Sequence, residues 1–173
     1  MDLNTIKQSI RNVPDFPKPG IQFKDISTLI KNHEVFEEVI KIFHESFKDK
    51  KIDVVIGIES RGFIFAAPLA LKLGCSFVMV RKPGKLPNET INEEYELEYG
   101  KDKLEIHSDS IKINDKVLIV DDLLATGGTA LATAKLVERL GSVNILFCFL
   151  IKLKDLDGQD LLEPYNIFSL LEY

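Results

Sequence analysis

Short β-branched runs alternate with helical segments along the middle of the chain, and this alternation constrains the fold more than any other feature of the sequence. Residues 52–58 and 116–120 have the composition of strands buried on both faces. Residues 63–73 and 129–140 have helical spacing, and each segment is followed by a glycine. Strands separated by helices predict an α/β fold with a central, mainly parallel sheet flanked by helices.

Further elements are predicted on either side of these segments. Residues 34–47 repeat apolar side chains at helical spacing, with acidic side chains on the opposite face, as in an amphipathic helix. More apolar runs typical of strands lie at residues 75–80, 143–151 and 166–171. Ligands of parallel sheets bind beyond the carboxyl ends of the strands, so we expect functional residues in the loops after the strands that begin at positions 52, 75 and 116.

One stretch interrupts the alternation of strands and helices. Residues 81–94 show no periodicity and are predicted to form a loop. Residues 95–99 and 103–107 alternate two kinds of side chain, which predicts an antiparallel pair of strands joined by a turn at residues 100–102. We therefore expect a hairpin in addition to the parallel sheet.

Composition excludes several classes of protein. The 173 residues are 45% hydrophobic and 28% charged, without internal repeats or low-complexity tracts, so we expect one globular domain over residues 1–173. The net charge of −5 argues against a nucleic-acid partner, and no apolar run is long enough to cross a membrane. Residues 1–11 lack the apolar stretch of a secretory signal. Cys75 and Cys148 lie in apolar runs and are expected to be buried, reduced thiols, which favours a cytoplasmic location.

The segment from Val117 to Thr129 carries the clearest chemical signal. An apolar strand runs into Asp121 and Asp122, and a Thr-Gly-Gly-Thr turn then opens a helix. Glycines let the backbone approach a ligand closely, and the unpaired amides at a helix start bind phosphate. We expect a phosphate to be held by the amides and threonine hydroxyls of Ala125, Thr126, Gly127, Gly128 and Thr129.

The two aspartates predict a second part of the same ligand. They would repel the phosphate if they faced it, so we expect Asp121 and Asp122 to accept hydrogen bonds from neutral hydroxyls one sugar length away. A phosphorylated sugar with a free diol satisfies both demands. The alternative is an ordinary turn with a capping threonine and a solvated acidic pair. Neither the P-loop nor the dinucleotide-binding fingerprint occurs in the chain.

The segment from Asp121 to Thr129 resembles the phosphoribosyl-diphosphate (PRPP) signature of type I phosphoribosyltransferases, and its form VDDLLATGGT is similar to that of the family's adenine-specific branch. Other stretches agree in order, at residues 15–21, 23–26, 59–63, 81–87, 97–101 and 168–171. The resemblance covers nearly the whole chain. It implies the type I phosphoribosyltransferase fold, with a small N-terminal hood at about residues 1–30, and a homodimer.

The resemblance also implies a reaction, in which adenine and PRPP give AMP and pyrophosphate in the presence of Mg²⁺. The metal is expected to be held mainly by the substrate, so no side chain is assigned to it. Displacing pyrophosphate passes through an oxocarbenium-like state while the purine loses a proton. The acid/base glutamate of the family corresponds to Glu98, with Tyr99 lining the site, whereas Glu96 is expected to lie at the surface.

Basic side chains after the second predicted strand are candidates for binding pyrophosphate. Arg81, Lys82 and Lys85 place three cations within five residues of an acidic protein. A solvated basic loop is the alternative on the sequence alone. The resemblance further implies that Arg61, in the Glu-Ser-Arg-Gly turn, contacts pyrophosphate, and Arg61 is assigned a catalytic role together with Glu98.

An aromatic ring near the N-terminus is a candidate for stacking on the base. Phe23 is suited to one face of a purine and Leu123 to the other, with core packing of Phe23 as the alternative. The resemblance implies that the base is read through backbone groups at Gln22 and Lys24. The three histidines are isolated in the sequence, and none is assigned a role.

Three other functions stay open at this point. The same chemistry on hypoxanthine, guanine or xanthine is the nearest of them. A PRPP-sensing regulator would need a DNA-binding module or a basic face, which the charge balance does not favour. A PRPP synthase-like protein is expected to be about twice this length.

Overall fold

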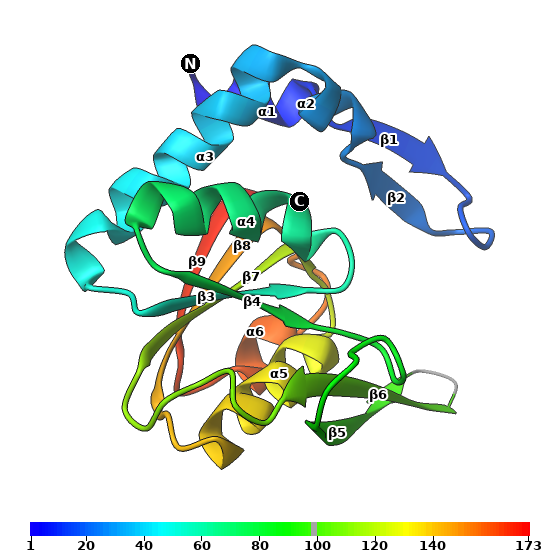
Figure 1. Ribbon diagram of the computed structural model, residues 1–173. Helices are drawn as coiled ribbons and strands as arrows, with labels where there is room; N and C mark the ends of the chain where they lie inside the picture. Colours follow the sequence, from blue (N-terminus) through cyan, green and yellow to red (C-terminus); the bar gives the residue numbers. More distant parts are fainter. Residues whose placement is uncertain (98–99) are drawn as a thin grey trace. The chain divides into compact units, whose positions relative to one another are not determined.

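The computed structural model describes residues 1–97 and 100–173. The chain forms two compact units, an N-terminal unit, Met1–Glu45, and a C-terminal unit, Ser46–Tyr173 (Figure 1). They are described separately. A single domain over residues 1–173, with a hood at about 1–30, stays a prediction.

The N-terminal unit combines helices with a small antiparallel sheet. Its elements are α1 (Leu3–Gln8), β1 (Arg11–Pro14), β2 (Gln22–Asp25), α2 (Ser27–Lys31) and α3 (His33–Phe47), whose last residues belong to the C-terminal unit. The Asp2 side chain caps α1 by accepting a hydrogen bond of 2.7 Å from the amide of Thr5. The amphipathic helix predicted at 34–47 is confirmed by α3.

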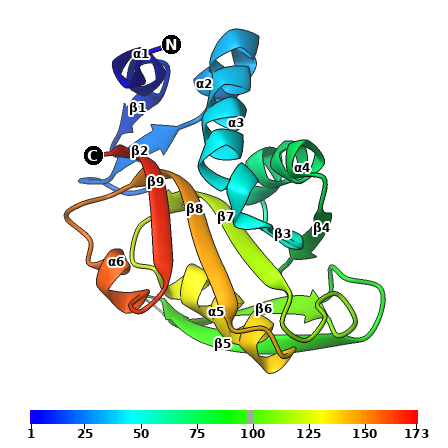
Figure 2. The same ribbon diagram turned by 90° about the vertical axis from the view of Figure 1, so that its left-hand side faces the viewer.

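A parallel sheet forms the centre of the C-terminal unit. Its strand order is β4-β3-β7-β8-β9 (Figure 2), and every neighbouring pair is parallel. The strands are β3 (Val54–Ile58), β4 (Ser76–Val80), β7 (Lys116–Leu124), β8 (Asn144–Lys152) and β9 (Asn166–Glu172). The predicted parallel sheet is therefore confirmed, and strand β3 is buried along its whole length, as expected of an apolar run covered on both faces.

Helices cover both faces of this sheet. Figure 1 shows α4 (Gly62–Leu73) on one side and α5 (Gly128–Arg139) and α6 (Gly158–Leu161) on the other. Helix α4 approaches β3 closely at Gly57, where an added Cβ would lie 2.9 Å from the ring of Phe63. A short 3-10 turn, η1 (Lys48–Lys50), precedes the sheet. Within residues 1–97 and 100–173, no helix is long and apolar enough to cross a membrane.

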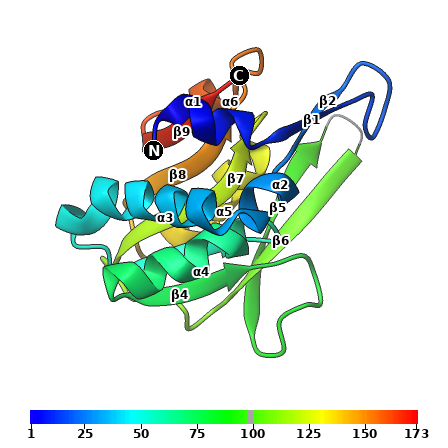
Figure 3. The same ribbon diagram turned by 90° about the horizontal axis from the view of Figure 1, so that it is seen from above.

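The hairpin is confirmed, but its limits differ from those predicted. Strands β5 (Thr90–Leu97) and β6 (Gly100–His107) pair along their lengths (Figure 3). The predicted loop at 81–94 is thus wrong from Thr90 onward, and the turn predicted at 100–102 is wrong because those residues pair with 95–97. The alternation of polar and apolar residues expected of a strand is interrupted at Glu93, a charged residue on the face of β5 that packs on α5. There its carboxylate lies 3.6 Å from Lys135 and 3.3 Å from Arg139.

The two cysteines are free thiols, but they differ in burial. Cys148 is buried in β8, as predicted. Cys75 is only half-buried, which corrects the prediction, because it stands just before β4 at the edge of the sheet. Burial raises the pKa of both thiols, and that of Cys148 most strongly.

Candidate active site

Three adjacent strands bring the predicted site residues to one edge of the sheet. In the parallel register, Ile58 of β3 is level with Val80 of β4, and Gly57 is level with Val120 of β7. The segments that follow these strands contain Arg61, the basic residues after Val80 and residues 125–127, whereas Asp121 and Asp122 lie within β7. These segments therefore lie at the carboxyl ends of the strands, where ligands of parallel sheets bind.

Strand β7 continues through both aspartates instead of ending at residue 120. Consecutive strand residues point to opposite faces, so Asp121 and Asp122 diverge. Asp122 is 3% exposed, and its Oδ2 lies 3.1 Å from Nε of Arg61. The amide of Asp122 donates a hydrogen bond of 2.9 Å to Oδ1 of Asp121. Arg61, at the start of α4, thus compensates the negative charge of the buried Asp122 carboxylate.

Loss of solvent controls the protonation of this acid pair, in which Asp121 is half-buried and Asp122 is buried. Loss of solvent, followed by the charge of Asp122, raises the pKa of Asp121 well above its usual range. Loss of solvent also raises the pKa of Asp122, while the Arg61 guanidinium opposes the rise. Hydrogen-bond donors stabilise the charged form of a carboxylate, so this pair favours a ligand that donates, such as a sugar diol.

Residues 125–129, the predicted phosphate loop, comprise the connection from β7 to α5 and the first two residues of α5. Gly127 is the N-cap of α5, with a φ of 81°, and its carbonyl accepts a hydrogen bond of 2.9 Å from the amide of Leu131. A small cavity of about 80 Å³ opens here. It is lined by Asp121, Leu123, Leu124, Ala125, Thr126, Gly127, Thr129 and Ala130. The structure therefore gathers most of the residues predicted to hold a sugar phosphate.

Glu59, which the sequence analysis missed, organises the predicted pyrophosphate residues. Its Oε2 accepts a hydrogen bond of 3.2 Å from Nε of Arg81 and one of 2.9 Å from the amide of Lys82. Burial alone would raise the pKa of Glu59, but these hydrogen bonds outweigh it and the pKa is lowered. The available signal was an acid directly before the Ser-Arg-Gly turn. The peptide bond between Glu59 and Ser60 is cis.

Lys82 is attached to the hairpin by its side chain. Its Nζ forms an ion pair with Asp102 and donates a hydrogen bond of 3.1 Å to the hydroxyl of Tyr95. The Tyr95 hydroxyl in turn donates a hydrogen bond of 3.0 Å to the Asp102 carboxylate. Burial would lower the pKa of Lys82, but these contacts outweigh it and raise the pKa. Lys85 is exposed. The structure thus places Arg81 against Glu59, and Lys82 against β5 and β6.

Three of the candidate base residues, Gln22, Phe23 and Lys24, lie on β2 in the N-terminal unit, whereas Leu123 lies on β7. Phe23 is half-buried, and its ring packs edge-on against Phe16 at a centroid distance of 5.1 Å. The side chains of the residues before and after Phe23 are both bound by Asn12 of β1. The Asn12 amide donates a hydrogen bond of 2.7 Å to Gln22 and accepts one of 3.0 Å from Nζ of Lys24. Both polar side chains are therefore turned toward β1.

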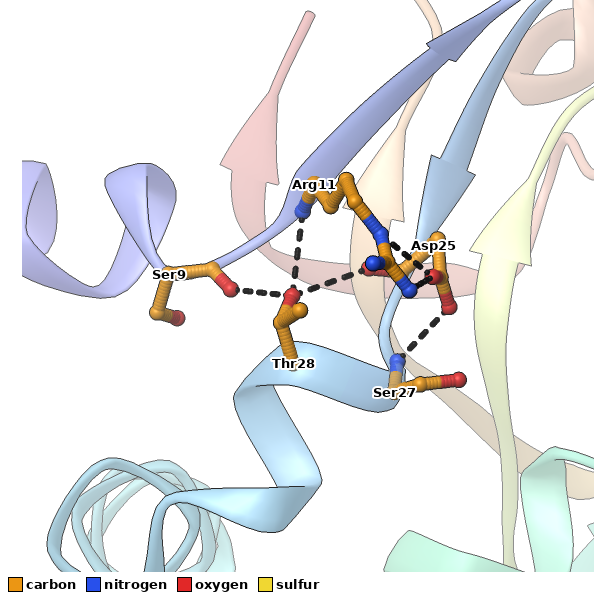
Figure 4. Close-up of polar contacts among 5 residues, drawn as sticks. All are labelled: Ser9, Arg11, Asp25, Ser27 and Thr28. Carbon is orange, nitrogen blue, oxygen red and sulfur yellow. Dashed lines mark hydrogen bonds and ion pairs between the residues drawn. The ribbon is translucent and has the colours of Figure 1, made fainter.

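A polar network ties this small sheet to α2 (Figure 4). Nε and Nη2 of Arg11 donate to one carboxylate oxygen of Asp25, at 3.0 and 2.5 Å, and the amide of Ser27 donates 2.9 Å to the other oxygen. The Thr28 hydroxyl donates 2.6 Å to the carbonyl of Ser9 and accepts 3.2 Å from the amide of Arg11. Hydrogen bonds from Ser27 and Arg11 lower the pKa of Asp25 to about 2.

Two predicted residues, Glu98 and Tyr99, lie outside the described residues. Glu96 is exposed, as expected. Among the side chains that the structure describes, no three of the His, Cys, Asp and Glu residues gather to hold a metal ion. Asp121 is the one acid among the described residues that line the cavity beside the β7–α5 connection, which fits Mg²⁺ bound through one carboxylate together with substrate oxygens.

Comparison with known proteins assigns this architecture to a family. The family model of the phosphoribosyl transferase domain matches residues 25–171. The chain belongs to the phosphoribosyltransferase family. The type I phosphoribosyltransferase fold predicted from the sequence motifs is confirmed by this match and by the parallel sheet.

Individual members of the phosphoribosyltransferase family are similar over almost the whole chain. The adenine phosphoribosyltransferase of Shewanella amazonensis is 56% identical over 95% of this chain and 91% of its own length. That of Thermoanaerobacter pseudethanolicus has a crystal structure with a TM-score of 0.96 and 51% identity, covering 99% of this chain and 100% of its own. The Saccharomyces cerevisiae enzyme, solved with an imino-altritol bisphosphate and adenine, has a TM-score of 0.92 and 42% identity, with 98% of each chain covered. These relatives confirm the resemblance to the adenine branch.

Proposed function

We propose that this chain transfers the 5-phosphoribosyl group of PRPP to adenine, giving AMP and pyrophosphate, a reaction of purine salvage. One observation carries the proposal. The connection from β7 to α5 lines a small cavity with an acid and the backbone of a glycine turn. It does so in a chain that is 56% identical to an adenine phosphoribosyltransferase.

The phosphate loop is proposed to hold the 5′-phosphate of PRPP. The amides of residues 125–129 stand at the start of α5, where the helix dipole and unpaired N–H groups attract an anion. Thr126 and Thr129 both line the cavity and can add hydroxyl donors. Asp121, which lines the same cavity, is then proposed to accept hydrogen bonds from the ribose hydroxyls, which stabilise its charged form, while Asp122 on the opposite face keeps its ion pair with Arg61.

The diphosphate is proposed to meet Arg61, Arg81, Lys82 and Lys85. Arg81 and Lys82 now bind carboxylates, Glu59 and Asp102, so each would exchange a carboxylate oxygen for a diphosphate oxygen. Such an exchange retains the charge compensation of both side chains. Mg²⁺, when bound to the diphosphate, supplies further charge neutralisation as pyrophosphate leaves.

The base is proposed to bind against β2, stacked between Phe23 and Leu123 and read by backbone groups of Gln22 and Lys24. The engagement of both polar side chains by Asn12 supports backbone recognition, since these side chains already have partners. Glu98 is proposed to take or shield the purine proton while the ribosyl carbon carries positive charge, with Tyr99 beside it.

A cytoplasmic homodimer without nucleic-acid or membrane partners completes the proposal. Exposed apolar side chains on α4 and the edge strand β4 support self-association: Leu71 is 85% exposed, Phe77 37% and Met79 40%. The two free thiols support a reducing location.

One assay tests the reaction. The protein is incubated with PRPP, Mg²⁺ and adenine, hypoxanthine, guanine or xanthine in turn, and nucleotide and pyrophosphate are measured. We expect stoichiometric AMP and pyrophosphate with adenine and little product with the other bases. Product from another base at an equal rate would replace adenine as the substrate, and binding of DNA or RNA at physiological salt without turnover would favour a regulator.

A further inference from the structure

We infer that Gly158, at the start of α6, is a positioning residue for the phosphate loop and that it sets the affinity of the site for the 5′-phosphoryl group. The inference rests on the proposed function of that loop. No motif in the sequence marks Gly158, because it lies in a polar segment far from the loop along the chain.

The backbones of Gly158 and the phosphate loop are in direct contact. A Cβ added to Gly158 would overlap the carbonyl oxygen of Ala125 and lie 2.9 Å from the amide nitrogen of Gly127. Conversely, a Cβ added to Gly127 would lie 2.6 Å from the carbonyl oxygen of Gly158. Distances below 3.0 Å to backbone atoms cannot be relieved by rotating a side chain, so any larger residue must move the main chain.

Burial of Gly158 contrasts with its surroundings. Residues 154–157 and 159–161 are exposed, whereas Gly158 is buried. Its amide donates a hydrogen bond of 2.8 Å to the carbonyl of Leu156, and Leu162 is 0% exposed in the core beneath. The segment also stays attached to β7, because the amide of Leu153 donates 3.0 Å to the carbonyl of Leu124. Gly158 is therefore held from both sides against the loop.

A fixed loop matters because phosphate is bound here by backbone amides. Their directions are set by the main chain alone, so a shift of the loop misaligns several donors at once. The residues of α6 contribute no group to the cavity that the loop lines. Gly158 therefore acts through Ala125 and Gly127 and does not touch the phosphate itself.

The test compares AMP with adenosine, which lacks only the phosphate. Titration calorimetry gives both dissociation constants for the full-length chain and for Gly158→Ala. We expect AMP affinity to fall about tenfold or more in the variant, as when one hydrogen bond to a charged group is lost. Adenosine affinity should stay within about twofold, because base and ribose contacts do not include the loop amides.

The control is Gly74→Ala at the end of α4. Gly74 has a φ of 68°, so alanine strains the backbone there, but an added Cβ would meet open space. This variant should lose some stability and keep the ratio of AMP to adenosine affinity. An unchanged ratio in Gly158→Ala would overturn the inference. A parent protein that binds AMP no better than adenosine would instead overturn the proposed function.

A second measurement serves if Gly158→Ala does not fold. Hydrogen exchange of the parent chain is followed with AMP and with adenosine. We expect AMP, but not adenosine, to slow exchange in residues 156–159 as well as in the phosphate loop. Protection of the loop without protection of 156–159 would contradict the inference, since the two segments would then respond independently.

Discussion

At the scale of single residues, the site holds two carboxylates whose negative charge is unfavourable in their surroundings. Asp121 and Asp122 are consecutive residues of β7, and the guanidinium of Arg61 opposes the rise in both pKa values. Protein stability would gain from removing one carboxylate, whereas a ligand that donates hydrogen bonds needs it. Such a conflict is common where a site is built for binding.

Asp121→Asn tests this conflict. Burial raises the folded-state pKa of Asp121, so the folded protein favours its protonated form, and this stability is lost as the pH rises through that pKa. Asparagine is neutral at every pH, so we expect a higher urea midpoint for the variant at neutral pH and a shrinking gain toward about pH 4, near the unfolded pKa. The KM for PRPP should rise by about tenfold.

The exposed Asp109 provides the matched control for this substitution. Asp109→Asn should change neither the urea midpoint at neutral pH nor the KM for PRPP. If Asp121→Asn were less stable than the parent at neutral pH, Asp121 would be a stabilising carboxylate and the assigned charge conflict would be wrong.

At the scale of elements, two attachments control how parts of the site are presented. The network of Arg11, Asp25 and Thr28 joins β1 and β2 to α2. The ion pair of Lys82 with Asp102 joins the segment after β4 to the hairpin. Each attachment acts on one part of the proposed substrate, so each predicts a selective effect.

Asp25→Asn should weaken adenine binding selectively. The change removes the ion pair with Arg11, so β2 loses this side-chain attachment to β1, and the proposed backbone recognition depends on the position of β2. We expect the KM for adenine to rise about three- to tenfold while the KM for PRPP is unchanged. Steady-state kinetics with each substrate varied in turn checks this. An equal rise in both constants would indicate general unfolding, which circular dichroism would reveal.

Asp102→Asn should strengthen pyrophosphate binding. Asparagine carries no charge, so it no longer competes with the diphosphate for the ammonium of Lys82. The gain is limited because a partly exposed ion pair stabilises a protein by at most about 1 kcal/mol. We therefore expect pyrophosphate affinity to rise about two- to fivefold, measured by calorimetry at low salt. Glu94→Gln is the control, because Glu94 forms a similar ion pair with Lys103 on the same hairpin. Weaker binding in Asp102→Asn would show that Asp102 orients Lys82 toward the ligand.

The sequence predicts some of these elements much better than others. Strand β3 and the first five residues of β7 follow from apolar runs rich in β-branched residues, and the acid pair with the Thr-Gly-Gly-Thr turn follows from the local order of residues. Strand β5 is missed from Thr90 because Glu93 pairs with α5, a partner distant in sequence. Gly158 and Glu59 are missed for the same reason, since their roles depend on tertiary contacts. The short elements β1 and β2 contain too few residues to show a period.

At the scale of the whole molecule, binding of the proposed ligand should stabilise the folded chain. A ligand that binds only the folded state stabilises it by about 2.7 kcal/mol at one hundred times its dissociation constant. For a chain of this length that is a rise in Tm of about 5–10 °C.

Scanning calorimetry with and without AMP tests the expectation of a single domain. We expect one unfolding transition for residues 1–173 and a shift of the whole transition by AMP. Adenosine at the same multiple of its own dissociation constant should give the same shift, which controls for occupancy. Two transitions, of which AMP moves only one, would show that the units of Met1–Glu45 and Ser46–Tyr173 unfold independently.

The mutual contact of Gly127 and Gly158 also limits how this chain can evolve. Neither glycine can be replaced by a larger residue while the main chain of the other segment keeps its position. A single substitution at either position is therefore not neutral. Drift in the segment around α6 should therefore leave Gly158 fixed while its exposed neighbours vary. A lineage that lost either glycine would have to rebuild the turn and the segment behind it together.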